Sequence, residues 1–339
     1  MNTSEDRIVQ LTLSLQMRER WLVVVECTAY FSVVLIAFVG NILFALTFYK
    51  IRTLRTPQNY YLVSLAVTDI LNAAACSIAL VALAEETWTY GDFICQLQGV
   101  IMSICGSVSP LTLGMIAINR YTKICRSRSL YQKIYSKRNV LTSIGISWIA
   151  ASILVVSAFF VRRTVYFYHP GKCWCFYKLD MDESLGLYIY ITFCYSMVVS
   201  FSFSTIVFSY YKVFRKIHAH YVQVGNSSLR DENSRALAEE LKITFMLLVT
   251  VLAFFICWTP SIITDLYEVF GGYYTLPRQV YMLNVFTFVG SSAVNPVIYG
   301  LMKKEFKEAY KTTKMPMRTK RWYGLKLFGA TIYIDCESN

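Results

Sequence analysis

Three polar residues stand inside long apolar runs, where each needs a chemical partner. Asp69 is a carboxylate within such a run, Arg120 closes another, and Asn295 precedes a proline in a third. A carboxylate removed from water, with no Lys or Arg nearby, needs a bound cation or a proton. A guanidinium group keeps its proton, so Arg120 must find hydrogen-bond acceptors. These residues predict an ion or proton site at Asp69 and an ion pair at Arg120.

The elements that position these residues are membrane spans. The chain has 339 residues, of which 55% are hydrophobic and 16% are charged, whereas about a quarter of the residues of soluble domains are charged. About twenty apolar residues cross the hydrocarbon core of a bilayer. Runs of this kind lie near 22–49, 58–84, 94–122, 139–161, 186–211, 242–268 and 276–301. We therefore predict an all-α protein built as a bundle of seven transmembrane helices.

The charges between these runs orient the bundle. Basic residues follow the first, third, fifth and seventh runs, whereas Glu85, Glu86 and Asp92 lie between the second and the third. Positive charge marks cytoplasmic loops, so we expect the N-terminus outside and the C-terminus inside. The net charge of +12 then belongs to these loops and not to a nucleic-acid surface. We expect an extracellular segment at 1–21 without a cleaved leader, a membrane domain at 22–301, and a cytoplasmic part at 302–339.

Two other classes of protein find less support. The ten cysteines include no CxxC pair and no His partner at metal spacing, which argues against a zinc site. The halves of the chain show no repeat and no matching pair of Gly- or Pro-broken spans, as transporter halves usually do. Asp69 is the only acid well inside the apolar layer. A multi-pass transporter or channel is therefore the alternative from another class.

Short motifs stand in most of the spans. They are Gly40-Asn41, Asp69, Asn119-Arg120-Tyr121, Trp148, Cys257-Trp258-Thr259-Pro260 and Asn295-Pro296-Val297-Ile298-Tyr299. In addition, Cys95 lies at the outer end of the third span, 25 residues before Arg120. Each motif alone is weak, but this set in this order resembles the rhodopsin-like family of G-protein-coupled receptors, from Gly40 to about Phe306.

The resemblance implies a receptor and not an enzyme, in the plasma membrane. It implies that an extracellular ligand shifts the balance between two packings, so that heterotrimeric G proteins couple, with arrestin and receptor kinases as further partners. Pro260 would act as a hinge in span six, where Phe254 and Trp258 repack. The residues implied in G-protein coupling are Asn119, Arg120, Tyr121, Tyr210, Glu240, Asn295, Pro296 and Tyr299.

The acid expected to hold Arg120 is Glu240. Most relatives carry an Asp before this Arg, whereas Asn119 offers only an amide. Glu240 precedes Trp258 by 18 residues, which is five helical turns, and so lies at the cytoplasmic end of span six, where relatives carry the acid of the inactive-state ion pair. Asn119, together with Pro110 and Ser202, departs from the family pattern. A seven-helix scaffold that binds partners without signalling therefore stays as an alternative.

The resemblance also implies where a ligand binds. Met102 stands where amine receptors carry an Asp, and Val289 stands where opsins carry the retinal-binding Lys, so we expect neither kind of receptor. Asn119 and Met102 resemble melatonin receptors, but Ala158 and Val198 replace the polar ligand contacts of that subgroup, so the relationship is distant. Acidic residues near the outer ends of the spans suggest a cationic small molecule or a peptide. The expected ligand-binding residues are Met102, Trp258, Ile262, Asp265 and Val289.

A sodium site and a membrane-surface helix are implied as well. Asp69, Ser109 and Asn295 match family positions that hold an allosteric Na⁺, and no other cofactor is expected. The run from Lys303 to Lys307 predicts a short amphipathic helix on the inner membrane surface, followed by a basic tail that binds anionic lipid.

Two extracellular modifications complete the expectations. Cys95 should pair with a cysteine of the second extracellular loop. We favour Cys175, because it leaves a shorter run to span five, and Cys173 is the alternative. Asn2 begins an outward-facing glycosylation sequon.

Overall fold

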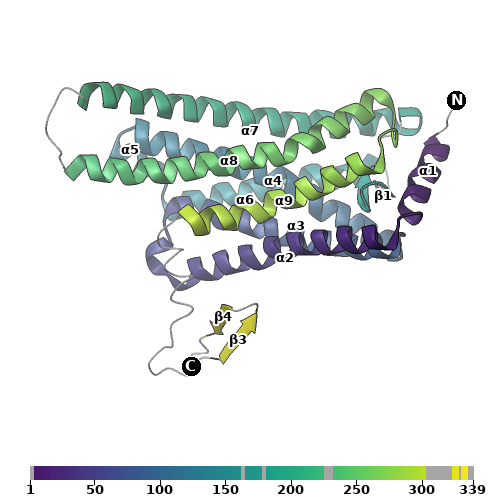
Figure 1. Cartoon of the computed structure of the whole chain (residues 1–339). Helices are drawn as coiled ribbons and strands as arrows, with labels where there is room; N and C mark the ends of the chain where they lie inside the picture. Colours follow the sequence, from purple (N-terminus) through teal and green to yellow (C-terminus); the bar gives the residue numbers. More distant parts are fainter. Residues whose placement is uncertain are drawn as a thin grey trace.

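The computed structural model describes residues 4–161, 165–177, 181–224, 232–302, 323–327 and 330–334. Within these ranges, seven helices are long and apolar enough to cross a membrane. They are α2 (Arg20–Lys50), α3 (Pro57–Glu85), α4 (Gly91–Cys125), α6 (Lys137–Val161), α7 (Met181–Val224), α8 (Glu232–Gly271) and α9 (Arg278–Met302). Their axes run roughly along one direction (Figure 1). The predicted bundle of seven transmembrane helices is confirmed.

The remaining described elements are short. They are α1 (Ser4–Gln16), the 3₁₀ turn η1 (Arg52–Leu54), α5 (Arg128–Ile134), the hairpin strands β1 (Tyr166–His169) and β2 (Trp174–Tyr177), and the paired strands β3 (Tyr323–Leu327) and β4 (Ala330–Ile334). Helix α1 and β1 lie at one end and α5 at the other (Figure 1). The two hairpins and α1 were not predicted. Asn2 and the expected helix at Lys303–Lys307 lie outside the described residues.

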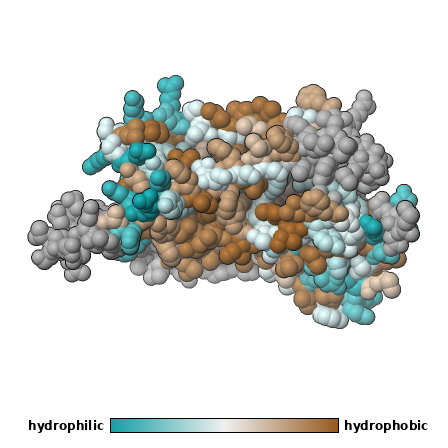
Figure 2. All heavy atoms as spheres, turned by 90° about the horizontal axis from the view of Figure 1, so that it is seen from above, coloured by the Kyte–Doolittle hydropathy of each residue, from teal (hydrophilic) through white to brown (hydrophobic). Residues whose placement is uncertain are grey.

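The helices form because lipid offers the backbone no hydrogen-bond partner, so each spanning segment must satisfy its own peptide groups. Their outer faces carry large apolar side chains that contact lipid instead of a protein core. Phe160 and Ile256, for example, are 89% and 71% exposed. Figure 2 shows hydrophobic residues over the middle of one face and hydrophilic residues gathered toward its ends. This distribution agrees with a bundle that crosses a bilayer.

Two helices continue past the predicted apolar runs. Helix α7 covers 181–224 where the sequence predicted 186–211, and α8 covers 232–271 where it predicted 242–268. The apolar run ends where the lipid ends, but the helical hydrogen bonds can continue into water. Pro260 lies inside α8 and Pro110 inside α4, and the helical assignment continues through both.

Buried side chains form two main apolar clusters along the bundle. One contains Phe254, Trp258, Tyr210 and Tyr299, with residues of α2, α3, α4, α7 and α9 around them. The other lies toward the end that carries α1 and β2 and includes Leu15, Met102, Trp174 and Val289. Met102 and Trp174 of this second cluster line the cavity described next.

Candidate functional site

A cavity lies between the helices, beneath the β1–β2 hairpin. Three of the expected ligand-binding residues, Met102, Trp258 and Asp265, line it. Ile262 and Val289 are not among the described lining residues, and Val289 is buried in the neighbouring apolar cluster. The rest of the wall is mostly aromatic or small, and comes from Gly99, Ser103, Gly106, Ser107, Leu154, Val155, Ala158, Tyr166, Lys172, Trp174, Cys175, Phe176, Tyr177, Cys194, Tyr195, Ser261, Asn284 and Phe288.

A disulfide ties the hairpin to the outer end of α4. Cys95 is joined to Cys175, with their Cα atoms 5.3 Å apart, and Cys173 is a buried free thiol. The favoured pairing is therefore confirmed. Trp88, from the preceding loop, stacks on Tyr168 of β1 with ring centroids 5.7 Å apart.

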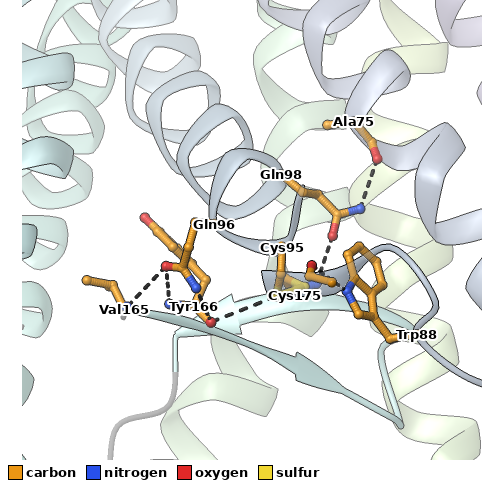
Figure 3. Close-up of a disulfide and its surroundings, with 9 residues drawn as sticks. Ala75, Trp88, Cys95, Gln96, Gln98, Val165, Tyr166 and Cys175 are labelled. Carbon is orange, nitrogen blue, oxygen red and sulfur yellow. Dashed lines mark hydrogen bonds between the residues drawn. A yellow bond between two sulfur atoms is a disulfide. The ribbon is translucent and has the colours of Figure 1, made fainter. Parts of the chain in front are cut away.

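Two glutamines of α4 hold both strands of the hairpin (Figure 3). Gln96 Oε1 accepts the backbone N–H groups of Val165 and Tyr166, each at 3.1 Å, and its Nε2 donates back to the Tyr166 carbonyl at 2.6 Å. Gln98 Oε1 accepts the Cys175 N–H at 2.9 Å. Because these bonds satisfy main-chain groups at the bundle end, the hairpin is a fixed part of the cavity roof.

Gly99 provides the space for this contact. A Cβ at this position would lie 2.2 Å from the ring of Tyr166, closer than real side chains approach. The absence of a side chain therefore lets β1 pack directly on α4.

The hairpin tip places a lysine inside the bundle. Lys172 is 1% exposed, and its ammonium lies 3.0 Å from Asp265 Oδ1 and 3.5 Å from Glu268 Oε2, both on α8. The ammonium also lies 3.9 Å from the ring centroid of Phe176. Burial alone would lower the pKa of Lys172, but the two carboxylates outweigh it and the pKa is raised. Lys172 is therefore a permanent cation in the cavity wall.

A histidine fixes the turn that carries this lysine. His169 Nδ1 accepts the N–H groups of Gly171 and Lys172 at 3.1 and 3.2 Å, so the ring proton is on Nε2, 3.4 Å from Glu268 Oε1. Burial lowers the pKa of His169 despite the neighbouring Glu268. Tyr281 of α9 also donates to Glu268 Oε1, at 2.7 Å. The neutral imidazole therefore holds the turn and the Glu268 carboxylate together.

The segment after α1 inserts an arginine beside the hairpin. Arg18 lies 2.6 Å from Glu26 of α2 and 3.4 Å from Glu86, and donates to the Leu83 carbonyl at 2.7 Å. Arg278 of α9 binds the same Glu26 carboxylate through two hydrogen bonds of 2.7 and 3.0 Å. Glu26 is thus shared by two buried guanidinium groups, which join the N-terminal segment to the first and last spans.

Aromatic rings connect the hairpin to the middle of the bundle. Trp174 of β2 contacts Phe288 with centroids 5.4 Å apart, Phe288 contacts Trp258 at 5.3 Å, and Trp258 stacks on Phe254 at 4.9 Å. We call these four residues the aromatic column. Phe254 and Trp258, the expected repacking pair, are therefore in contact and continuous with the roof of the cavity.

At the cytoplasmic end, Arg120 is fully buried between two acceptors. Its Nη1 lies 3.0 Å from Glu240 Oε2 and its Nη2 donates to Asn119 Oδ1 at 2.8 Å. Lys123 also approaches Glu240, at 2.6 Å from Oε1. The contact that the family resemblance and the helical spacing together implied is present, and its role in signalling stays a prediction. The side chain of Glu240 keeps 29% exposure, so the pair lies at the edge of water.

The other expected coupling residues are partly or fully buried in the bundle. Tyr121 packs on Phe208 of α7, with centroids 5.7 Å apart. Tyr210 and Tyr299 are both buried, and no hydrogen bond joins their hydroxyl groups to each other. Pro296 packs against Gly40, where a Cβ would come within 2.7 Å of the proline ring.

The expected sodium residues are close together but are not all joined. Asn295 donates to Asp69 Oδ2 at 2.8 Å, whereas Ser109 donates to Thr68 at 3.1 Å. Asp69 is 3% exposed and forms no ion pair with any described Lys or Arg. Asp69 therefore faces the amide nitrogen of Asn295, and a hard cation would need the Asn295 amide to turn its oxygen toward the site.

Sequence reasoning missed the residues contributed by the extracellular segments. The signal for the hairpin was present, because Pro170-Gly171 separates two aromatic runs, which is a turn pattern. Ile8, Leu11 and Leu15 follow helical spacing in α1 and pack inward. Lys172 and Arg18, however, carried no signal that their side chains point into the protein.

Known proteins resemble the chain over most of its length. The family model described as "7 transmembrane receptor (rhodopsin family)" matches residues 40–299. Melatonin receptor type 1C of Xenopus laevis is 28% identical over 83% of this chain, which spans 65% of that receptor, just under two thirds of its length. Rhodopsin of Sphodromantis sp. is 28% identical over 84% of this chain and 76% of that protein. The crystal structure of squid rhodopsin aligns with a TM-score of 0.76 at 21% identity, covering 87% of this chain and 86% of that one, and shows the shared fold.

Proposed function

The chain belongs to the rhodopsin family of seven-transmembrane receptors, and on this premise we propose that it transmits the binding of an extracellular ligand to heterotrimeric G proteins at the plasma membrane. The ligand occupies the cavity beneath the β1–β2 hairpin. The G protein binds at the opposite end of the bundle, where Arg120 lies. The family is one of receptors and not of enzymes, so binding and a change of packing account for its activity.

The observation that carries this proposal is the restraint on Arg120. The guanidinium is 0% exposed and joins α4 to α8 through Glu240 at 3.0 Å. A receptor needs two conformations that differ in their affinity for ligand and G protein, and a contact that stabilises one of these conformations. Outward movement of α8 would break the pair and free Arg120 to contact a G protein. Tyr210 and Tyr299, which do not yet hydrogen-bond to each other, would meet in the second packing.

The aromatic column supplies the connection between the two ends. A ligand in the cavity touches Trp258 and Phe288 directly, and Phe254 stacks on the far side of Trp258. Because close packing transmits displacement between neighbouring side chains, a shift of Trp258 would move Phe254 and Phe288 and reposition α8 around Pro260. Arrestin and receptor kinases are the further partners that this mechanism implies.

The names of the relatives do not identify retinal or melatonin as the ligand of this chain. Val289 provides no amine for a retinal Schiff base. Ala158 lines the cavity without a polar group where melatonin receptors carry a ligand contact. The proposal therefore leaves the ligand to the chemistry of this cavity.

The test is expression with a panel of G-protein dissociation sensors, with ligand-free signal recorded at matched surface levels. We expect a basal signal with at least one G protein, abolished by Arg120→Ala. If neither wild type nor Glu240→Ala gives a signal with any G protein while the receptor reaches the surface, the chain is a non-signalling scaffold and the proposal is wrong.

A further inference from the structure

We infer that the cavity takes an uncharged aromatic ligand with a hydrogen-bond acceptor, because the protein's own Lys172 already occupies the acidic subsite and Asn284 is left with a free donor. This inference rests on the proposed function and names the ligand class for the same cavity. It also replaces the cationic ligand that the acidic residues near the outer ends of the spans suggested.

The charge balance of the wall is the first argument. Among the described lining residues, Asp265 is the only acid and Lys172 the only base, and the two lie 3.0 Å apart. An ammonium ligand that approaches Asp265 would stand beside a second positive charge. Like charges at such distances repel, and the repulsion is strong where water is excluded. A ligand ammonium therefore cannot use Asp265 unless Lys172 leaves.

Lys172 has little freedom to leave. It is 1% exposed, shares Glu268 at 3.5 Å, and lies against the Phe176 ring at 3.9 Å. Its backbone N–H is held by His169 Nδ1 at 3.2 Å. Moving it would leave two carboxylates without their cation, which is costly in a buried site.

Three other acids near this end of the bundle, Glu26, Glu86 and Glu268, are also engaged. Glu26 binds Arg18 and Arg278, and Glu86 lies 3.4 Å from Arg18. Glu268 accepts from Tyr281 at 2.7 Å in addition to its contact with Lys172. None of these carboxylates lines the described cavity.

Asn284 provides the second, independent argument. Its side chain is 2% exposed and lines the cavity, and its Oδ1 accepts from Ser261 at 2.9 Å. The Nδ2 group has no partner among the residues that the structure describes. Two further lining donors, the indole N–H groups of Trp174 and Trp258, are buried without a hydrogen-bond partner among the described residues. A buried donor without an acceptor costs free energy, so a ligand carbonyl or ether oxygen that accepts from one of these groups would stabilise the complex.

The remaining wall selects for apolar and flat groups. Trp258 and Phe288 face the cavity from α8 and α9, and Ser107 already donates to the Ser103 carbonyl at 3.0 Å. Aromatic walls with few free polar groups favour an aromatic ligand. Such a molecule with an acyl or ether oxygen would satisfy both the wall and Asn284.

The test compares matched pairs of probes that differ in charge. Phenethylamine, tyramine and tryptamine are set against their N-acetyl derivatives, and binding is measured as the rise in thermal unfolding temperature of the purified receptor without G protein. We expect the N-acetyl member of a pair to stabilise the wild-type receptor and the amine not to. In Asn284→Ala the affinity for the N-acetyl probe should fall about tenfold.

Two variants test the role of Lys172. Lys172→Met keeps the length of the side chain but removes its charge, so the amine of each pair should now stabilise this variant more than the N-acetyl probe does. The double variant Lys172→Met with Asp265→Asn should no longer be stabilised by the amines. Lys172→Arg keeps the charge and should keep the wild-type preference, which guards against a variant that merely misfolds. Amines that stabilise the wild-type receptor in an Asp265-dependent way would overturn the inference, and so would the failure of every probe to bind folded receptor. The unfolding measurements use no G protein, so a failure of this inference leaves the proposed function untouched. The proposed function is tested separately by the signalling that depends on Arg120.

Discussion

Removing the acid that holds Arg120 should raise signalling in the absence of ligand. In Glu240→Ala, Arg120 loses the 3.0 Å contact to α8 and keeps only the 2.8 Å bond to Asn119 on its own helix. Lys123 loses its 2.6 Å contact at the same time. No polar contact between described residues then joins α4 to α8 at this point, so the packing in which α8 has moved outward becomes less unfavourable.

The magnitude lies between two limits. An exposed ion pair contributes about 1 kcal/mol or less, whereas breaking a fully buried pair costs about 3–5 kcal/mol. Arg120 is fully buried, but the Glu240 side chain is 29% exposed and Asn119 remains as an acceptor. We therefore expect about 1–2 kcal/mol, which is a change of roughly 5- to 30-fold in the ratio of the two packings.

The assay is ligand-free dissociation of a G-protein sensor at matched surface expression. Lys123→Ala is the matched control, because it removes the more exposed partner of Glu240 and leaves the Arg120–Glu240 pair intact. Its effect on the basal signal should be much smaller. Asn119→Asp in the Glu240→Ala background gives Arg120 a charged partner again and should lower the signal. If Glu240→Ala and the double variant both signal like wild type, Arg120 is not restrained here and the reasoning is wrong.

Four further outcomes follow from the described contacts. Replacing Na⁺ by a large organic cation should raise the basal signal of wild type but leave Asp69→Asn unchanged; equal sodium responses would remove the ion from this site. Cys173 should react with an alkylating agent only after unfolding, as peptide mapping would detect, because it is 2% exposed. Burial lowers the pKa of His169, so the imidazole stays neutral in the folded receptor while the unfolded chain binds a proton below the ordinary histidine pKa of about 6.5. The free energy of unfolding should therefore fall as the pH drops below that value, by at most about 1.4 kcal/mol per pH unit. The unfolding temperature of a His169→Asn variant should depend less on pH over the same range. Gly99→Ala should lower the unfolding temperature, because the new methyl group would displace Tyr166, and an unchanged temperature would mean that the hairpin packs more loosely than described.

The contacts within the membrane were more predictable than the contacts outside it. Apolar length alone predicts the spans, because lipid permits little else. Helical spacing places Glu240 at the cytoplasmic end of its span, and the resemblance to the family implies its pairing with Arg120. The hairpin follows neither rule. Lys172 meets Asp265 across 93 residues of sequence, and its direction depends on the hairpin register and on an aromatic surface formed by other helices. A pattern that predicts a turn does not predict what its tip will contact.

The shared carboxylate of Glu26 has a consequence for the order in which the protein is made. Glu26 lies on the first span to leave the ribosome and Arg278 on the last, 252 residues later. Until the seventh span is inserted, Glu26 has only Arg18 to bind, and the N-terminal segment is fastened at one side alone. Domains and segments made early must wait for such distant partners during synthesis. The extracellular end of this receptor is therefore completed last, and a chain that stops before Arg278 would display an unfinished end to the quality control of the secretory pathway.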